Sequence, residues 1–89
     1  MADGARPPAE DELELVYIAG KLREAQAVET FLEERGIMFL VEPGEYLGGV
    51  IFRRVRIGAC FYVKADDAAR TRTLLAKSGY RPQPGPRRA

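Results

Sequence analysis

The sequence predicts a small α+β sandwich in which two helices cover one face of an antiparallel sheet. Three observations lead to it. The chain has 89 residues, enough for a single domain. Two stretches have the spacing of amphipathic helices, and three are short, rich in β-formers and bounded by glycine or proline. We therefore expect one domain over residues 13–80, with disordered segments at 1–12 and 81–89.

The first half of the domain is expected to contain a strand and a helix. Residues 13–20, LELVYIAG, are rich in β-formers and end at a glycine, which predicts a strand. Residues 21–36 have helical spacing, and Gly36 supplies the expected stop. A right-handed crossover would place this helix on one face of the sheet. Its apolar stripe consists of Leu22, Ala25, Val28, Phe31 and Leu32.

The second strand is expected at residues 37–42, IMFLVE, directly after the helix. Residues 43–49, PGEYLGG, contain two dipeptides that are typical of turns, Pro43-Gly44 and Gly48-Gly49. A glycine-rich phosphate cradle is the alternative for this segment, but such cradles normally lead into the start of a helix. Because this segment joins two strands, the sequence favours a flexible hairpin loop.

The third strand is expected to include residues 53–63, RRVRIGACFYV, because apolar and other residues alternate along it. One face of the strand should lie in the core under the helices. That face carries Val55, Ile57, Ala59, Phe61 and Val63. The opposite face should meet solvent, and it carries Arg54, Arg56, Gly58, Cys60, Tyr62 and Lys64.

The second helix is expected at residues 66–79, with Asp66 as its N-cap and Asp67 in its first turn. A metal site is the alternative role for this Asp pair, but no third or fourth ligand lies nearby in the sequence. The sequence leaves open a short fourth strand near Tyr80. The order strand, helix, strand, strand, helix, with both helices on one face, is the ferredoxin-like βαββα(β) arrangement.

Composition argues against several classes of function. The chain has no histidine, hence no imidazole base or metal ligand, and its single cysteine allows neither an internal disulfide nor a thiolate zinc site. No stretch approaches the roughly 20 apolar residues that span a bilayer, and we expect no signal peptide or membrane anchor. The net charge of +1 gives no global attraction to nucleic acid. We expect a cytoplasmic, non-enzymatic protein without metal or cofactor.

The uncovered face of the sheet is the expected binding surface. Apolar side chains rimmed by cations are typical of protein–protein contacts. The candidate binding residues are Met38, Leu40, Arg54, Arg56, Tyr62 and Lys64. We expect the 43–54 loop to contribute, and the partner to be another protein or a second copy of the chain, with a small ligand as the alternative.

Two stretches of the sequence contain residue pairs in a recognisable arrangement. In the first helix the pairs are Glu24-Ala25, Leu32-Glu33 and Gly36-Ile37. At the junction of the third strand and the second helix the residues are Val63, Asp66-Asp67 and Leu74-Leu75. With these residues the chain resembles a small bacterial family of prokaryotic signal-transducing proteins, a domain of unknown function grouped with the PII-like regulatory folds. The resemblance covers residues 13–77 and implies a regulatory protein that works by association, without catalytic residues.

The alternative function is binding of single-stranded nucleic acid, because an RNA-recognition module has the same order of elements. VYIAGKL resembles the first signature of that module, and RIGACFYV, about forty residues later, lies where the second would be. The positions that need stacking aromatics hold Gly58 and Cys60 instead. Tyr17 and Tyr62 remain as rings that could each stack on one base. The sequence thus favours protein binding over RNA binding.

Overall fold

The computed structural model describes residues 12–48 and 54–84. Its elements, in chain order, are β1 (Leu13–Ala19), α1 (Leu22–Glu34), β2 (Leu40–Gly48), β3 (Arg54–Lys64) and α2 (Ala65–Lys77). The strands form an open antiparallel sheet in the order β1-β3-β2. The predicted α+β class, with three strands and two helices in this part of the chain, is confirmed.

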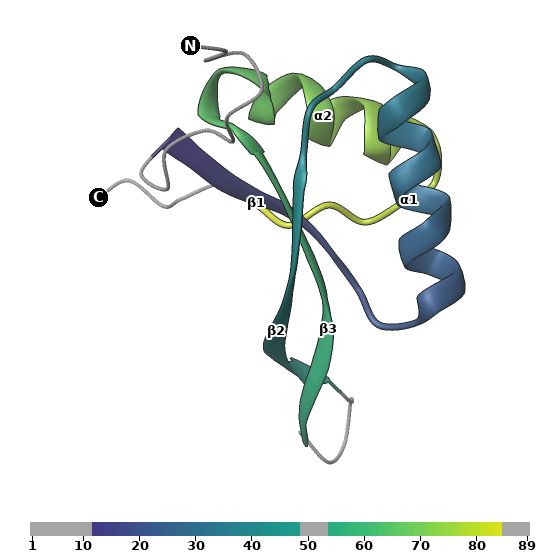
Figure 1. Cartoon of the computed structure of the whole chain (residues 1–89), viewed down its shortest axis with the longest axis vertical. Helices are drawn as coiled ribbons and strands as arrows, with labels where there is room; N and C mark the ends of the chain where they lie inside the picture. The colour runs from purple at the N-terminus through teal and green to yellow at the C-terminus, as the bar shows by residue number, and fades with distance from the viewer. Residues whose placement is uncertain (1–11, 49–53, 85–89) are drawn as a thin grey trace, which may run out of the picture.

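Both helices and one face of the sheet contribute to a single core (Figure 1). Tyr17 pairs directly with Phe61 across β1 and β3, so both side chains lie on this face. The buried helical residues are Ala25, Val28, Phe31 and Leu32 of α1, and Ala68, Thr71 and Leu75 of α2. The apolar stripe predicted for the first helix is therefore confirmed except at Leu22, which is exposed.

Each helix ends at a glycine in the left-handed region. Gly36 has a φ of 69° and Gly79 a φ of 91°, values that side chains with a Cβ rarely adopt. The residue after each glycine, Ile37 or Tyr80, donates its N–H to a carbonyl oxygen of the last helical turn at 3.0 Å. This arrangement turns the chain back toward the core, and the predicted stop at Gly36 is confirmed.

The helix α2 begins earlier than the sequence predicts. Its N-cap is Lys64, which forms no side-chain capping bond, and Asp66 lies inside the first turn. The prediction of Asp66 as the N-cap was therefore wrong, because β3 continues to Lys64 and leads directly into the helix. Asp66 and Asp67 still lie where negative charge favours the helix dipole.

The strand β2 begins and ends later than the sequence predicts. Residues 37–39 form no strand but bring the chain from α1 to the sheet, and Ile37 is buried there. Pro43 and Gly44, which were expected in a loop, lie within β2 and pair with β3. The boundaries predicted for the strand at 37–42 and the loop at 43–49 were therefore wrong, and residues 49–53 lie outside the described residues.

Close packing explains why turn-forming residues occur inside β2 and β3. A Cβ atom at Gly44 would lie 2.6 Å from the Sγ of Cys60, and one at Gly58 would lie 2.8 Å from the backbone oxygen of Ala19 and 2.9 Å from the Cε1 of Tyr46. These positions need glycine because atoms of the neighbouring strands occupy the space above them: a side chain at Gly44, and both backbone and a side chain at Gly58. Pro43 is tolerated because β2 is an edge strand.

The strands β2 and β3 form a hairpin that extends beyond the helices. The two strands contain nine and eleven residues, and their pairing continues as far as Gly48 and Arg54. In Figure 1 the lower end of this hairpin points away from both α1 and α2. The helices therefore cover only part of the sheet face on which they pack.

This geometry leaves part of the predicted core face of β3 in solvent. Phe61 and Val63 are fully buried, as predicted, and Ala59 is half-buried. Val55 and Ile57 are 63% and 73% exposed, so the prediction that they are buried was wrong. The alternation along β3 is as expected, but helical cover stops near Ala59.

After α2 the chain returns alongside β1. The described residues 80–84 contain no assigned strand, but the N–H of Gln83 donates to the carbonyl of Val16 at 2.7 Å. Arg72 of α2 donates to the carbonyl oxygens of Gln83 at 2.7 Å and Leu15 at 3.0 Å. Gln83, within the predicted tail, thus lies against β1 and α2. Residues 85–89 of that tail, and residues 1–11 of the predicted lead, lie outside the described residues.

Candidate functional site

The open sheet face brings together two of the residues predicted to bind a partner. Leu40 and Tyr62 pair directly across β2 and β3, and both are half-buried. Met38 is 58% exposed and lies just before β2. These three form the apolar part of the predicted site.

The cations of the predicted site are spread along β3. Arg56 and Lys64 are both exposed and lie eight positions apart, which corresponds to about 27 Å along an antiparallel strand. Lys64 is at the end of β3 that leads into α2. Arg54 pairs with Gly48 at the other end, and its side chain lies outside the described part of the structure. Arg56 and Lys64 therefore do not converge on one ligand.

The middle of the open face is filled by the hairpin itself. The ring of Tyr46 lies against Gly58, while Cys60 is only 4% exposed. Burial raises the pKa of the Cys60 thiol, and the nearby charge of Glu42 raises it further. Cys60 is therefore a packing residue rather than a reactive thiol.

Tyr17 lies on the helix-covered face. Its ring packs edge-on against Phe61 and Tyr80, with centroids 6.4 Å and 5.6 Å apart. Its hydroxyl donates to the carboxylate of Glu24. Burial and this hydrogen bond raise the pKa of Tyr17. The ring is 4% exposed, so it is not available to stack on a base, contrary to the interpretation that Tyr17 and Tyr62 each accept one.

Large exposed apolar side chains gather on the opposite side of the hairpin, the side that the helices cover elsewhere. Leu22 is 75% exposed at the start of α1, and it lines the same cavity as Ile57 of β3, which is 73% exposed. Val55 is 63% exposed and lies two positions before Ile57, on the same face of β3. Pro43 of β2 is exposed beside them. We call these four residues, Leu22, Pro43, Val55 and Ile57, the hairpin surface.

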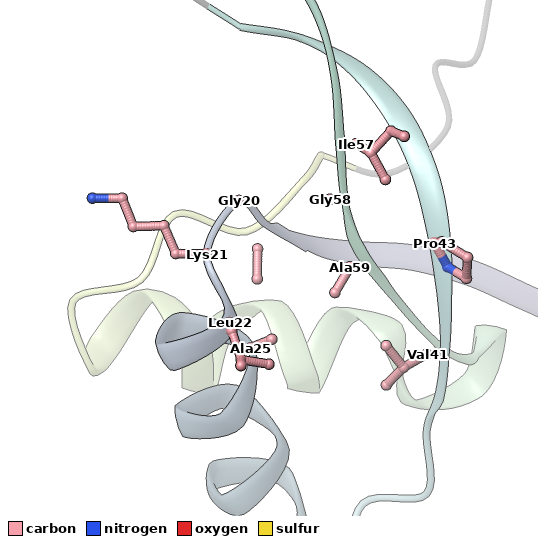
Figure 2. Close-up of a pocket in the computed structure, with 10 residues that line it drawn as sticks. Gly20, Lys21, Leu22, Ala25, Val41, Pro43, Ile57, Gly58 and Ala59 are labelled. Carbon is pink, nitrogen blue, oxygen red and sulfur yellow. The ribbon is translucent and has the colours of Figure 1, made fainter.

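The hairpin surface borders an open cavity of about 360 Å³ (Figure 2). Small residues leave this space empty, since Ala19, Ala25 and Ala59 are among those that line it. In Figure 2, Leu22 and Lys21 lie on one side of the cavity and Pro43 on the other. The lining is apolar apart from Lys21, so the cavity suits an apolar side chain of a partner.

The hairpin surface was not predicted from the sequence. One signal was present: the predicted third strand, at 53–63, was about twice as long as the second, at 37–42, so the backbone groups of part of it had no predicted partner on that strand. The turn dipeptides at 43–44 and 48–49 masked this signal. The alternation of apolar and polar residues along β3 does not indicate where the helices cease to cover the strand.

The described residues contain no group of three or more His, Cys, Asp or Glu side chains that could hold a metal ion. Within the same residues, neither helix has the length and apolar character needed to cross a membrane. Comparison of the chain with protein-family models, curated proteins and solved structures finds no match.

Proposed function

We propose that this chain is a non-enzymatic binding domain of the regulatory, signal-transducing type, which acts by associating with a protein. The proposed site is the hairpin surface, formed by described residues of α1, β2 and β3, together with the adjoining open sheet face. The observation that carries the proposal is that Leu22 and Ile57, both more than half exposed, line one apolar cavity, with the exposed Val55 next to Ile57 on the same face of β3. Contiguous exposed apolar surface of this kind marks protein–protein contacts.

The magnitude of the exposure supports this function. Full burial of one Leu, Ile or Val side chain contributes about 1.5–3 kcal/mol, so three of them represent at most roughly 5–9 kcal/mol. This is comparable to the whole stability of a typical domain, about 5–15 kcal/mol. A small domain has little apolar area to spare, and a partner that covers these side chains would recover part of this free energy.

The fold supports the same proposal. The strand order β1-β3-β2, with a helix after β1 and another after β3, is compatible with a truncated ferredoxin-like arrangement. That arrangement is the one implied by the resemblance to the PII-like signal-transducing family. We place the protein in the cytoplasm, since its one cysteine is a buried free thiol that packs against its neighbours.

RNA recognition is less well supported. Of the two candidate stacking rings, Tyr17 is buried, and the exposed cations Arg56 and Lys64 are far apart on β3. We expect single-stranded RNA to bind weakly and to dissociate as salt is raised, in a fluorescence anisotropy titration at two salt concentrations. Tight binding that persists at high salt would favour the RNA-recognition function instead.

Site-specific photo-crosslinking tests the proposed function. A photoreactive phenylalanine analogue replaces Ile57 in one variant and Thr73, an exposed residue of α2, in a control variant. Irradiation is carried out in the cells that produce the protein, and adducts are identified by mass spectrometry. We expect discrete protein adducts at position 57 and none at position 73. The same adducts at both positions, or none at position 57, would contradict the proposal.

A further inference from the structure

We infer that the partner of the hairpin surface is a second copy of this chain, in a two-fold contact that sets Lys21 of one copy against Glu45 of the other. The inference rests on the proposed function of the same surface and names its partner. It follows from the placement of charge around the apolar side chains.

The hairpin surface has a cation on one side and an anion on the other. Lys21 lies at the start of α1, across the cavity from Pro43 in Figure 2. Glu45 follows Pro43 on the same face of β2, where it pairs with Ile57. Both charged side chains are exposed, and neither forms an ion pair with another residue in the described part of the chain.

The positive side of the surface is the start of α1, where Lys21 has no ion-pair partner among the described residues. The acid of its first turn, Glu24, accepts hydrogen bonds from the hydroxyl of Tyr17 and, at 3.3 Å, from the N–H of Gly20. Its carboxylate is thus held by β1 and by the link before α1, and its one negative charge partly offsets the helix dipole. Lys21 forms no side-chain cap, and it lies at the positive end of the helix dipole. A carboxylate brought to this point by a partner would be favoured.

In a two-fold contact, each side of the surface on one copy faces the opposite side of the same surface on the other copy. With the axis close to Ile57, the Lys21 side of one copy would meet the Glu45 side of the other, and the reverse pair would form simultaneously. The exposed Leu22, Val55 and Ile57 would lie between the two ion pairs, each of them present twice. The hairpin surface is therefore complementary to itself in both charge and polarity.

Two other ways of pairing copies are less favourable. Pairing through the free edge of β2 is hindered by Pro43, which lacks an N–H, and by the exposed Glu42 and Glu45. Pairing through the open sheet face would use Leu40 and Tyr62, which are already half-buried. The hairpin surface offers more apolar area to cover.

A charge-reversal experiment tests the inference. Wild-type protein is expected to form dimers at tens of micromolar in sedimentation velocity. Lys21→Glu and Glu45→Lys should each raise the dimer dissociation constant by about tenfold or more, because each replaces two attractions by two repulsions. An equimolar mixture of the two single variants should form heterodimers, since both contacts then pair opposite charges. Native mass spectrometry, with one variant isotopically labelled, identifies these heterodimers.

The control is Glu33→Lys, which makes the same charge change as Glu45→Lys but at an exposed residue near the other end of α1. It should leave the dissociation constant unchanged. Circular dichroism should show every variant folded, because the substituted residues are exposed. Wild-type protein that stays monomeric at hundreds of micromolar, or a mixture that forms no heterodimer, would overturn the inference. If position 57 then crosslinks to a different protein, the proposed function stands without the homodimer; if it crosslinks to nothing, both fail.

Discussion

The hydroxyl of Thr71 is the one buried side-chain polar atom in the described residues that has no hydrogen-bond partner. It lies in α2 among the apolar residues of the core and is fully buried. A buried hydroxyl without a partner destabilises the folded state, because it has lost its hydrogen bonds to water. Replacing the Thr71 hydroxyl therefore tests whether α2 packs on the core as the structure shows.

We expect Thr71→Val to raise the free energy of unfolding by about 1–2 kcal/mol, since valine has the same shape without the hydroxyl. Thr73→Val, at an exposed position of the same helix, is the control and should change it by less than about 0.5 kcal/mol. Urea unfolding measures both. A loss of stability in Thr71→Val would show that the hydroxyl does have a stabilising contact.

Cys60 and Tyr17 give the domain a pH dependence on the alkaline side. Burial raises the pKa of both groups, with Glu42 adding to the effect at Cys60 and Glu24 at Tyr17. A raised folded-state pKa contributes stability that is fully present below the pKa of the unfolded chain, about 8.5 for cysteine and 10 for tyrosine. That stability is lost as the pH rises further.

Between pH 7 and 8 we therefore expect these two groups to leave the free energy of unfolding unchanged. Above about pH 9 the free energy of unfolding should decline. Cys60→Ala should make the early part of the decline shallower, since only Tyr17 then remains. Urea unfolding at constant ionic strength provides the measurement. Stability that increased from pH 8 to 10 in wild-type protein would contradict the burial of both groups.

At the scale of the element, periodicity and glycine stops were sufficient to predict β1, α1 and α2 to within a few residues. Their signals are local: apolar spacing along the helix, and a glycine where the chain must turn. The strand β2 was misplaced because Pro43 and Gly44 have a local preference for turns. Their position in a strand depends on Cys60 and on the edge location of β2, which are features of the tertiary structure.

The limit of helical cover along β3 can be tested with two substitutions on one face of one strand. Phe61→Ala removes a fully buried ring and should lower the free energy of unfolding by about 3–5 kcal/mol. Ile57→Ala changes a side chain that is 73% exposed, and in dilute monomeric protein it should change stability by less than about 0.5 kcal/mol. Urea unfolding of both variants is the check. Similar losses would mean that the core extends along the hairpin.

At the scale of the whole molecule, the candidate site could be predicted only in part. The register of β3 correctly placed Tyr62 beside Leu40 on one face, because alternation fixes the face of each residue. Alternation does not determine how far two helices extend over a sheet. The exposure of Val55 and Ile57 arises from the length of the hairpin relative to the helices, which becomes known only when all the elements are assembled.

The most direct test introduces a thiol at position 57 and measures its rate of alkylation. The rate shows whether the hairpin surface is uncovered in the free protein and whether a partner covers it in the cell. The variant carries Ile57→Cys and Cys60→Ala, and the control carries Thr73→Cys and Cys60→Ala. In dilute purified protein both thiols should react at similar rates, because both positions are exposed. In the cells that produce the protein, position 57 should react about tenfold more slowly than position 73, corresponding to roughly 90% occupancy by a partner. Equal rates in the cell would contradict the binding function, and a slow reaction at position 57 in dilute protein would contradict the exposed hairpin itself.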